Sequence, residues 1–437
     1  MPKPCTAITS CLNDVTMVTT ALSVADTCAA AKRASRVLAT VGADTKNAAL
    51  EAIAAALISR TGDILEANAR DLEAARASGV APHLIDRLAL DAGRVATIAA
   101  QVRDIAALED PVGEVISGSR LANGLDVRKV RVPLGVIAVV YEARPNVTID
   151  AAALCLKSGN AIVLRGSSMA TSSNAALAGI AIEAAEAAGL PAGAMALVAG
   201  GGTEELAELA TQTGVVDLII PRGGERLKAA LKGVATVPVI YAASGNCHVY
   251  VDATADLDAA EAIILNAKVQ KPSVCNSAEK LLVHSDVAEA FLPRALDALA
   301  TAGVTLRGDE RARAAAGRAP VGEATEADWD TEFLALELAV GVVDSVHEAI
   351  DHINLHGSGH SEAIVTRDTE AARAFQLGVD AACVYVNAST RFTDGGEYGM
   401  GAEIGNSTQK LHARGPIGLR ELCTFKYLAE GSGQIRP

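Results

Sequence analysis

The stretch Val132-Pro-Leu-Gly-Val-Ile-Ala-Val-Val-Tyr141 decides the fold class. It is an almost uninterrupted apolar run, but it is far shorter than the ~20 residues of a membrane span. Short Val- and Ile-rich runs are typical of strands buried on both faces of a parallel sheet. Similar runs alternate with helical patterns downstream: we expect strands at 136–140, 161–164, 196–198, 216–220 and 238–242, and helices at 147–156, 172–188, 203–211 and 225–232. This alternation predicts βαβ units in a doubly wound, nucleotide-binding domain.

The alternation starts again after Ser244-Gly-Asn246. There we expect strands at 280–283, 334–343, 362–366 and 382–386, and helices at 259–268, 287–302, 345–355 and 369–376. Upstream, the apolar spacing from Val24 to Leu108 is helical. Asn123-Gly124, between two runs that can pair, predicts a β-hairpin. The fold class is therefore α/β, with two doubly wound domains and a hairpin.

Composition excludes several classes of protein. The 437 residues carry 38 Lys and Arg against 52 Asp and Glu, a net charge of −14, and only 3% are aromatic. Nucleic-acid binding needs a basic face or stacking aromatics, so we expect no nucleic-acid partner. We also expect no membrane association, because no apolar run is long enough. The eight cysteines contain no C-x-x-C pair, which fits thiols in a reducing cytoplasm.

The segment Asn266-Ala-Lys-Val-Gln-Lys-Pro-Ser-Val-Cys-Asn-Ser277 carries the strongest candidate nucleophile. A helix must end before Pro272, which leaves Cys275 in a polar loop with Lys271 nearby. We expect a partly exposed thiol whose pKa is lowered by the cation, and which is therefore nucleophilic. The alternative is an inert packed cysteine, as we expect for Cys155 and Cys383 in their apolar runs.

Asn146 follows the deciding strand directly. The carboxyl end of a strand in a doubly wound domain faces the ligand crevice, where an amide can stabilise an oxyanion. Asn is also a common helix N-cap after such a turn. Both interpretations stay open.

Two other strand ends suggest a dinucleotide site. Arg165 ends the strand Ala161–Leu164, where a cation accommodates the 2′-phosphate of NADP; the alternative is an exposed arginine on a turn. The turn Pro221-Arg-Gly-Gly224 precedes a helix whose N–H groups can bind phosphate, although it lacks the G-x-G-x-x-G pattern.

Three histidines, His352, His356 and His360, lie four residues apart, which suggests metal ligation. Gly357 and Gly359 break the helix between them, and no adjacent carboxylate pair completes a ligand set. We therefore expect no metal.

Taken together, the chain resembles the gamma-glutamyl phosphate reductase family of the aldehyde dehydrogenase superfamily. The resemblance spans roughly residues 20–430 and is carried by V-P-L-G-V-I-A-V-V-Y-E-A-R-P-N-V-T-I-D from Val132, L-I-I-P-R-G-G from Leu218, P-S-V-C-N from Pro272, V-Y-V-N-A-S-T-R-F-T-D-G-G-E from Val384 and T-Q-K-L-H-A-R-G-P-I-G-L from Thr408.

The resemblance implies an activity and a domain plan. The activity is NADPH-dependent reduction of L-glutamate 5-phosphate to L-glutamate 5-semialdehyde and phosphate, in proline biosynthesis. The expected parts are a loose extension at 1–18, an NADP-binding domain at 19–118 and 133–244, a catalytic domain at 245–414, and an oligomerisation element at 119–132 and 415–437. A homo-oligomer is implied, and a glutamate 5-kinase is the partner to test.

The resemblance also assigns residues. Cys275 would form the thioester, with Asn146 and the backbone N–H of Cys275 at the oxyanion. The expected cofactor contacts are Arg165, Gly166, Ser167, Pro221, Arg222, Gly223, Gly224 and Glu332, the last at the nicotinamide ribose. The expected substrate contacts are Arg144, Lys271, Arg391 and Asp394. For Arg391 and Asp394, the alternative is a scaffolding role within their glycine-rich loop.

Two departures from the superfamily matter. Aldehyde-oxidising relatives carry a glutamate base in the segment matching Ser244-Gly-Asn246, and none is present here. Water needs that base to attack a thioester, whereas expelling phosphate does not. Lys271 replaces an expected Arg, which loses the bidentate fork. The alternatives are an aldehyde or acyl-CoA dehydrogenase using the same thiol, and a non-catalytic NADP-binding protein.

Overall fold

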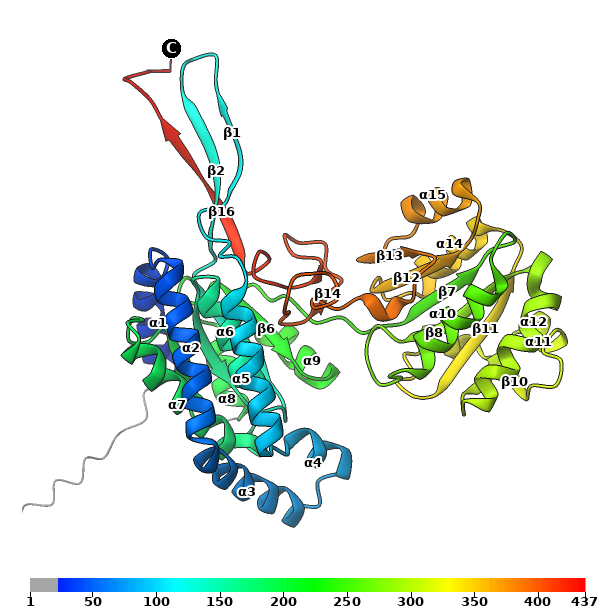
Figure 1. Ribbon diagram of the computed structural model, residues 1–437, viewed down its shortest axis with the longest axis horizontal. Helices are drawn as coiled ribbons and strands as arrows, with labels where there is room; N and C mark the ends of the chain where they lie inside the picture. The colour runs from blue at the N-terminus through cyan, green and yellow to red at the C-terminus, as the bar shows by residue number, and fades with distance from the viewer. Residues whose placement is uncertain (1–22, 201, 437) are drawn as a thin grey trace, which may run out of the picture.

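The computed structural model describes residues 23–200 and 202–436, which form two α/β lobes and a projecting arm (Figure 1). The extension expected at 1–18 lies outside these residues. None of the helices within the described ranges is both long and apolar enough to cross a membrane.

The first lobe is built on a four-stranded parallel sheet in the order β5-β4-β3-β6. The strands are β3 (Val136–Tyr141), β4 (Ala161–Arg165), β5 (Met195–Leu197) and β6 (Leu218–Arg222). Every residue of β3 is buried, because helices cover both faces of the sheet. The deciding stretch is therefore a central strand, as its composition predicts.

The helices of this lobe form two layers. They are α1 (Val24–Leu38), α2 (Ala43–Ser59), α3 (Thr61–Ala77), α4 (Pro82–Leu88), α5 (Ala92–Ala107), α6 (Val147–Lys157), α7 (Thr171–Ala187), α8 (Thr203–Ala210) and α9 (Glu225–Val234), with a 3₁₀ turn η1 (Ser168–Ala170). Helices α2, α5, α6 and α7 share one apolar core with the sheet, and α1, α8 and α9 share the core on its other face.

One predicted strand is wrong. Residues 238–242 form no strand; only an isolated bridge joins Val239 to Ile219. Pro238 has no N–H for a sheet ladder, and the N–H of Tyr241 donates to the side-chain oxygen of Gln409 at 2.7 Å. The segment runs instead toward the second lobe.

The second lobe contains a seven-stranded parallel sheet in the order β10-β9-β11-β8-β7-β12-β13. Its strands are β7 (Cys247–Val251), β8 (Ala278–His284), β9 (Thr305–Gly308), β10 (Val321–Glu323), β11 (Glu337–Val343), β12 (Ser361–Val365) and β13 (Cys383–Val386). Its helices are α10 (Leu257–Val269), α11 (Ser285–Thr301), α12 (Glu310–Ala314), α13 (Glu326–Asp330), α14 (Val346–His356) and α15 (Thr369–Gly378), and a 3₁₀ turn η2 (Thr390–Phe392) follows β13. Strands β7, β9 and β10 were not predicted.

Two connections join the lobes. The first runs from β6 and α9 into β7, and the second returns from β13 to the first lobe, where Ile404, Ile417 and Leu422 join its core. On the way it forms the small antiparallel pair β14 (Asn406–Ser407) and β15 (Gly415–Pro416). The two connections are bonded to each other, because the N–H of Ala243 donates to the carbonyl of Asn406 at 2.9 Å.

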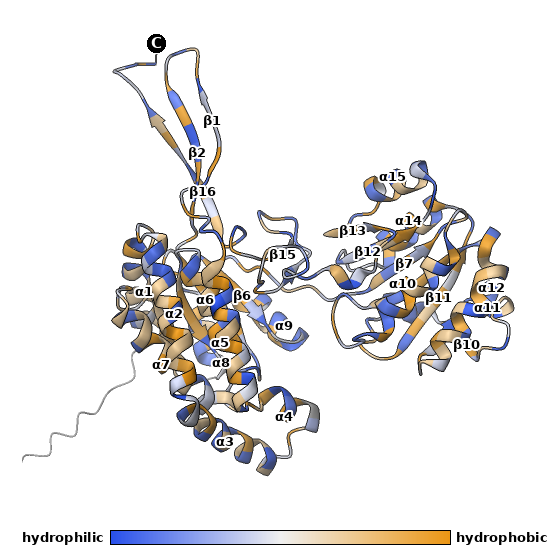
Figure 2. Cartoon of the chain, viewed as in Figure 1, coloured by the Kyte–Doolittle hydropathy of each residue, from blue (hydrophilic) through white to orange (hydrophobic). Residues whose placement is uncertain are grey.

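The arm is a three-stranded antiparallel sheet that stands away from both lobes (Figure 1). It consists of β1 (Val115–Arg120), β2 (Asp126–Pro133) and β16 (Cys423–Glu430) in the order β1-β2-β16. The turn between β1 and β2 contains the predicted Asn123-Gly124, with Gly124 at φ 86°. Figure 2 shows hydrophilic and hydrophobic residues alternating along this arm; in β16, Phe425 and Tyr427 are 45% and 65% exposed.

Candidate active site

Cys275 lies in the loop between α10 and β8. Helix α10 ends at Val269, before Pro272, as predicted from the missing proline N–H. Of the six cysteines in the described residues, Cys275 alone is partly exposed, and Cys155 and Cys383 are buried. Among these six thiols, Cys275 is therefore the one that a substrate can reach.

Neighbouring segments hold this loop in place. The side-chain amide of Asn276 donates to the carbonyl of Thr393 at 3.0 Å, and the hydroxyl of Thr390 donates to the carbonyl of Asn276 at 2.7 Å. On the other side, a Cβ atom at Gly245 would lie 1.4 Å from the carbonyl oxygen of Cys275. Only glycine fits at position 245, so the first connection between the lobes packs directly on the nucleophile loop.

The segment Ser244–Asn246 contributes no carboxylate to the site. The side-chain amide of Asn246 donates to the carbonyls of Trp329 and His356, both at 2.7 Å. The N–H of Gly245 donates to Oε1 of Glu332 at 2.6 Å. Glu332, expected at the nicotinamide ribose, is thus fixed to the same backbone turn that supports Cys275.

The expected lowering of the thiol pKa is wrong. Burial raises the pKa of Cys275, the negative charges of Glu403 and Glu332 raise it further, and Arg222 opposes them. Lys271 is exposed and does not appear among the charges that dominate this pKa. The cation that lowers this pKa most is Arg222, which comes from the end of β6.

Arg144 and Arg391 also lie within electrostatic range of the thiol. Burial lowers the pKa of both side chains, and the charge of Cys275 opposes that shift. Arg391 is positioned by a hydrogen bond from its Nε to the side-chain oxygen of Gln270, 3.0 Å away. Cations from both lobes therefore face the nucleophile.

Asn146 occupies the N-cap position of α6, but its side chain makes no capping hydrogen bond. Its Nδ2 instead donates to Oδ2 of Asp150 at 2.8 Å. Burial raises the pKa of Asp150 to about 6, although the bond from Asn146 and the charge of Arg222 lower it. The prediction that the Asn146 side chain caps the helix is therefore wrong. The side-chain amide of Asn146 is instead oriented by the carboxyl group of Asp150, one turn along α6.

The strand ends predicted for a dinucleotide meet at one edge of the first sheet. Val140 pairs with Arg165, and Tyr141 pairs with Arg222. Arg165 is only 7% exposed, which excludes the exposed-turn alternative, and its Nη2 donates to the carbonyl of Gly202 at 2.5 Å. Burial lowers the pKa of Arg165.

The backbone at this edge of the sheet is closely packed, and position 166 has no space for a side chain. A Cβ atom at Gly166 would lie 2.0 Å from the side chain of Asn174. Ser167 follows, just before η1. The turn Pro221–Gly224 leads into α9, whose N-terminus has no side-chain cap; the N–H of Gly224 donates to a carboxylate oxygen of Glu142 at 3.0 Å. This N-terminus can therefore bind an anionic oxygen.

Two further features complete the site. Glu403, which the sequence did not single out, accepts the N–H of Gly395 at 2.9 Å. It stands next to the predicted Asp394. Burial raises the pKa of Glu403, and the charge of Asp394 raises it further.

Among the described residues, no three His, Cys, Asp or Glu side chains converge as metal ligands; the rings of His352 and His356 lie 4.7 Å apart, tilted by 47°.

Comparison with known proteins places these residues in a family. The profile described as "Aldehyde dehydrogenase family" matches residues 7–316. Gamma-glutamyl phosphate reductases of Thermobifida fusca and Moorella thermoacetica are 54% and 55% identical over 406 residues, covering 93% of this chain and 97% of each relative. The solved structure of gamma-glutamyl phosphate reductase from Thermotoga maritima superposes with a TM-score of 0.93 at 44% identity, covering 95% of this chain and all of that one.

The raised pKa of Cys275 predicts its reactivity. At neutral pH the thiol is mostly protonated, so alkylation by iodoacetamide is slow and reaches half its limiting rate above about pH 8.5, the ordinary cysteine value. Glu403→Gln removes a negative charge that raises this pKa, so the midpoint moves to lower pH. Peptide mass spectrometry of Cys275 across a pH series measures the rate.

Glu397→Gln is the matched control, because Glu397 is exposed in the same loop and does not appear among the charges acting on the thiol. A midpoint below pH 8 in the unmodified protein would contradict the burial argument.

Proposed function

The chain belongs to the gamma-glutamyl phosphate reductase family, within the aldehyde dehydrogenase family, and we propose that it reduces L-glutamate 5-phosphate with NADPH through a thioester on Cys275. It is an oxidoreductase that acts on an acyl phosphate and an aldehyde, in proline biosynthesis. Its family uses a nicotinamide cofactor. The choice of NADPH and the role of each residue are proposals.

The observation that carries the covalent step is Cys275, the one partly exposed thiol among the described residues, within electrostatic range of Arg222, Arg144 and Arg391. The thiolate attacks the carbonyl carbon of the acyl phosphate, forming a C–S bond. Nδ2 of Asn146 and the N–H of Cys275 donate to the oxyanion. Phosphate then leaves with the electron pair of the C–O bond, and Arg144, Lys271 and Arg391 are the candidates to hold it.

When bound, NADPH would supply a hydride to the carbonyl carbon of the Cys275 thioester. Cleavage of the C–S bond would then release the semialdehyde and return Cys275 as a thiolate. Arg165, Gly166 and Ser167 are proposed to hold the adenosine side, where a cation suits a 2′-phosphate. Pro221, Arg222, Gly223 and Gly224 would offer the N-terminus of α9 to the diphosphate, and Glu332 would accept hydrogen bonds from the nicotinamide ribose.

The reaction run backwards tests this function. With semialdehyde and NADP, we expect NADPH formation only when phosphate is present, because Ser244–Asn246 provides no base to activate water. General-base help is worth roughly 10²–10⁴ in rate, so hydrolysis should trail phosphorolysis by about that factor. Cys275→Ala should abolish turnover, while NADPH still binds in a fluorescence titration.

Cys275→Ser is the conservative comparison, and it should be nearly as inactive, since an unassisted hydroxyl is a poor nucleophile. A high rate extrapolated to zero phosphate would mean that the protein works as an ordinary aldehyde dehydrogenase. Turnover by Cys275→Ala would exclude the thioester.

The preference for NADPH is proposed to depend on Arg165. Replacing Arg165 with Gln should reduce the NADPH-over-NADH preference in kcat/KM about tenfold or more, because one charge-assisted contact is worth roughly 1.5–3 kcal/mol. Arg36→Gln, an exposed change on α1, is the control for lost charge. Equal use of both cofactors by the unmodified protein would show that Arg165 does not select the phosphate.

The arm supports a proposed homo-oligomer. Strand β1 is exposed throughout and leaves an unpaired edge, and β16 carries the exposed rings of Phe425 and Tyr427. A small sheet without a core is only marginally stable in water, and open strand edges favour pairing with another chain.

The six described thiols are free, which supports a location in the reducing cytoplasm. A glutamate 5-kinase would supply the labile acyl phosphate, and direct transfer from it is a further proposal.

Light scattering at micromolar concentration tests the arm. We expect an oligomer for the unmodified protein, and dissociation for Phe425→Asp with Tyr427→Asp. Leu355→Asp, at an apolar side chain 75% exposed on α14, should leave the size unchanged. A monomeric unmodified protein would refute the proposal.

A further inference from the structure

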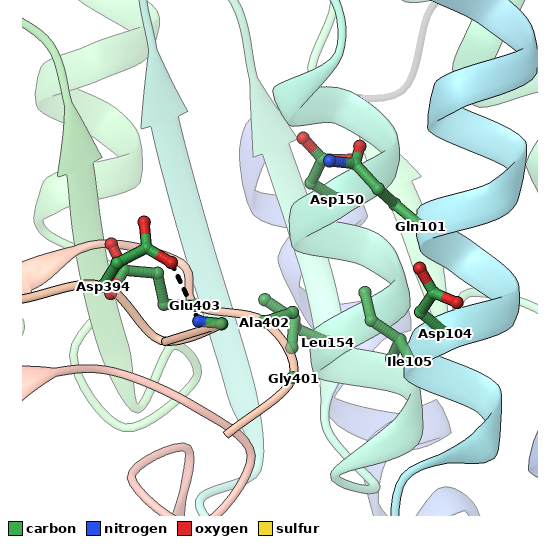
Figure 3. A pocket seen from close by; sticks show the side chains of 10 residues that line it. Gln101, Asp104, Ile105, Asp150, Leu154, Asp394, Gly401, Ala402 and Glu403 are labelled. Atoms are coloured by element: carbon green, nitrogen blue, oxygen red, sulfur yellow. Dashed lines mark hydrogen bonds between the residues drawn. The ribbon is translucent and has the colours of Figure 1, made fainter. Parts of the chain in front are cut away.

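A cavity of about 230 Å³ lies between helices α5 and α6 on one side and the segment from Asp394 to Glu403 on the other (Figure 3). Helix α5 contributes Gln101 and Asp104, and helix α6 contributes Asp150. The segment after η2 contributes Asp394 and Glu403 from the opposite side. In Figure 3 these polar side chains gather around the same hollow from three separate elements.

The lining is strongly acidic. It includes four carboxyl side chains and no lysine or arginine among the described residues. Oδ1 of Asp150 is inaccessible to solvent and has no hydrogen-bond partner among the residues described, whereas Oδ2 accepts the amide of Asn146. A buried carboxylate oxygen without a donor costs free energy, and a ligand donor can remove that cost.

The arrangement of the acids favours an organic cation over a metal. A metal ion needs at least three oxygen ligands that converge at about 2–2.6 Å, and no such group occurs among the described residues. An ammonium group carries three N–H donors and no acceptor. It can therefore reach separate carboxylates through charge-assisted hydrogen bonds.

The cavity is also close to the reacting thiol. Glu403 lines it and raises the pKa of Cys275, so the carboxylate and the sulfur lie within electrostatic range. Asn146, bonded to Asp150, links the cavity to the proposed oxyanion site. The cations that face Cys275 are absent from the lining. A substrate that is anionic at its reacting end and cationic at the other would match this separation of charge.

We propose that this cavity receives the α-ammonium group of the amino-acid substrate, with Asp150 and Glu403 as hydrogen-bond acceptors and Asp104 as a further charge. This inference rests on the proposed function and adds the feature that makes the site specific for an amino acid. An aldehyde of the same length without the amino group would leave the buried oxygen of Asp150 without a donor.

Kinetics with two aldehydes test the assignment. L-glutamate 5-semialdehyde and 5-oxopentanoate differ only by the α-amino group, and the oxidation of each is measured in the presence of phosphate and NADP. Asp104→Asn should lower kcat/KM for the semialdehyde about tenfold and leave 5-oxopentanoate within twofold. Glu403→Gln should change the ratio of the two values in the same direction. Glu397→Gln, in the same loop but outside the cavity, should change neither.

Protection of the thiol provides a measurement that does not need turnover. L-glutamate should slow alkylation of Cys275 more strongly than glutarate, which lacks the amino group, and Asp104→Asn should remove that difference. An unchanged substrate ratio in both cavity variants, or equal protection by both ligands, would overturn the assignment. If the unmodified protein oxidises neither aldehyde with phosphate, the proposed function fails, and the protection experiment still decides whether the cavity binds an ammonium group.

Discussion

The contact between the backbone of Gly245 and the carbonyl of Cys275 is the constraint on which the rest of the site depends. It allows no side chain at position 245, so the turn that enters the second sheet lies flat against the nucleophile loop. The same turn donates its N–H to Glu332, and Asn276 ties the loop to the segment that carries Arg391. Three distant parts of the chain therefore hold one thiol in one position.

Charges of both signs act on this thiol. Arg222 ends a strand of the first sheet and stabilises the thiolate, while Glu403 and Glu332 favour the protonated form. Burial adds to the effect of the acids, so the resting site keeps its nucleophile neutral. Such a thiol resists oxidation and adventitious modification better than an exposed, ionised one.

The sequence predicts the parts of this structure that depend on local pattern. The run ending at Tyr141 is the central strand, and Pro272 ends the helix before the nucleophile as proline chemistry requires. Strand β7 was missed because His248 interrupts its apolar pattern; in the fold that histidine is buried against Glu362, with a contact of 3.0 Å. Pairing with a residue 114 positions away cannot be read from a single stretch.

The errors at the site have the same origin. Lys271 is near Cys275 in sequence, yet the cation that lowers the thiol pKa most is Arg222, which the first sheet brings there. Glu403 has no motif of its own, and its position depends on a bond to Gly395. The direction of the thiol pKa depends on burial, which only the assembled lobes create. Resemblance to a family supplied the identity of the nucleophile, but not its electrostatic surroundings.

The paired connections between the lobes determine how the molecule can bend. The two strands of chain cross side by side and are joined by the bond from Ala243 to Asn406 and by that from Tyr241 to Gln409. The two connecting segments attach one lobe to the other at two points, and these two points define an axis. A twist of one lobe against the other across that axis would break the hydrogen bonds that join the connections. Swinging motion would widen or narrow the space in front of Cys275 while leaving the support behind it, at Gly245, in place.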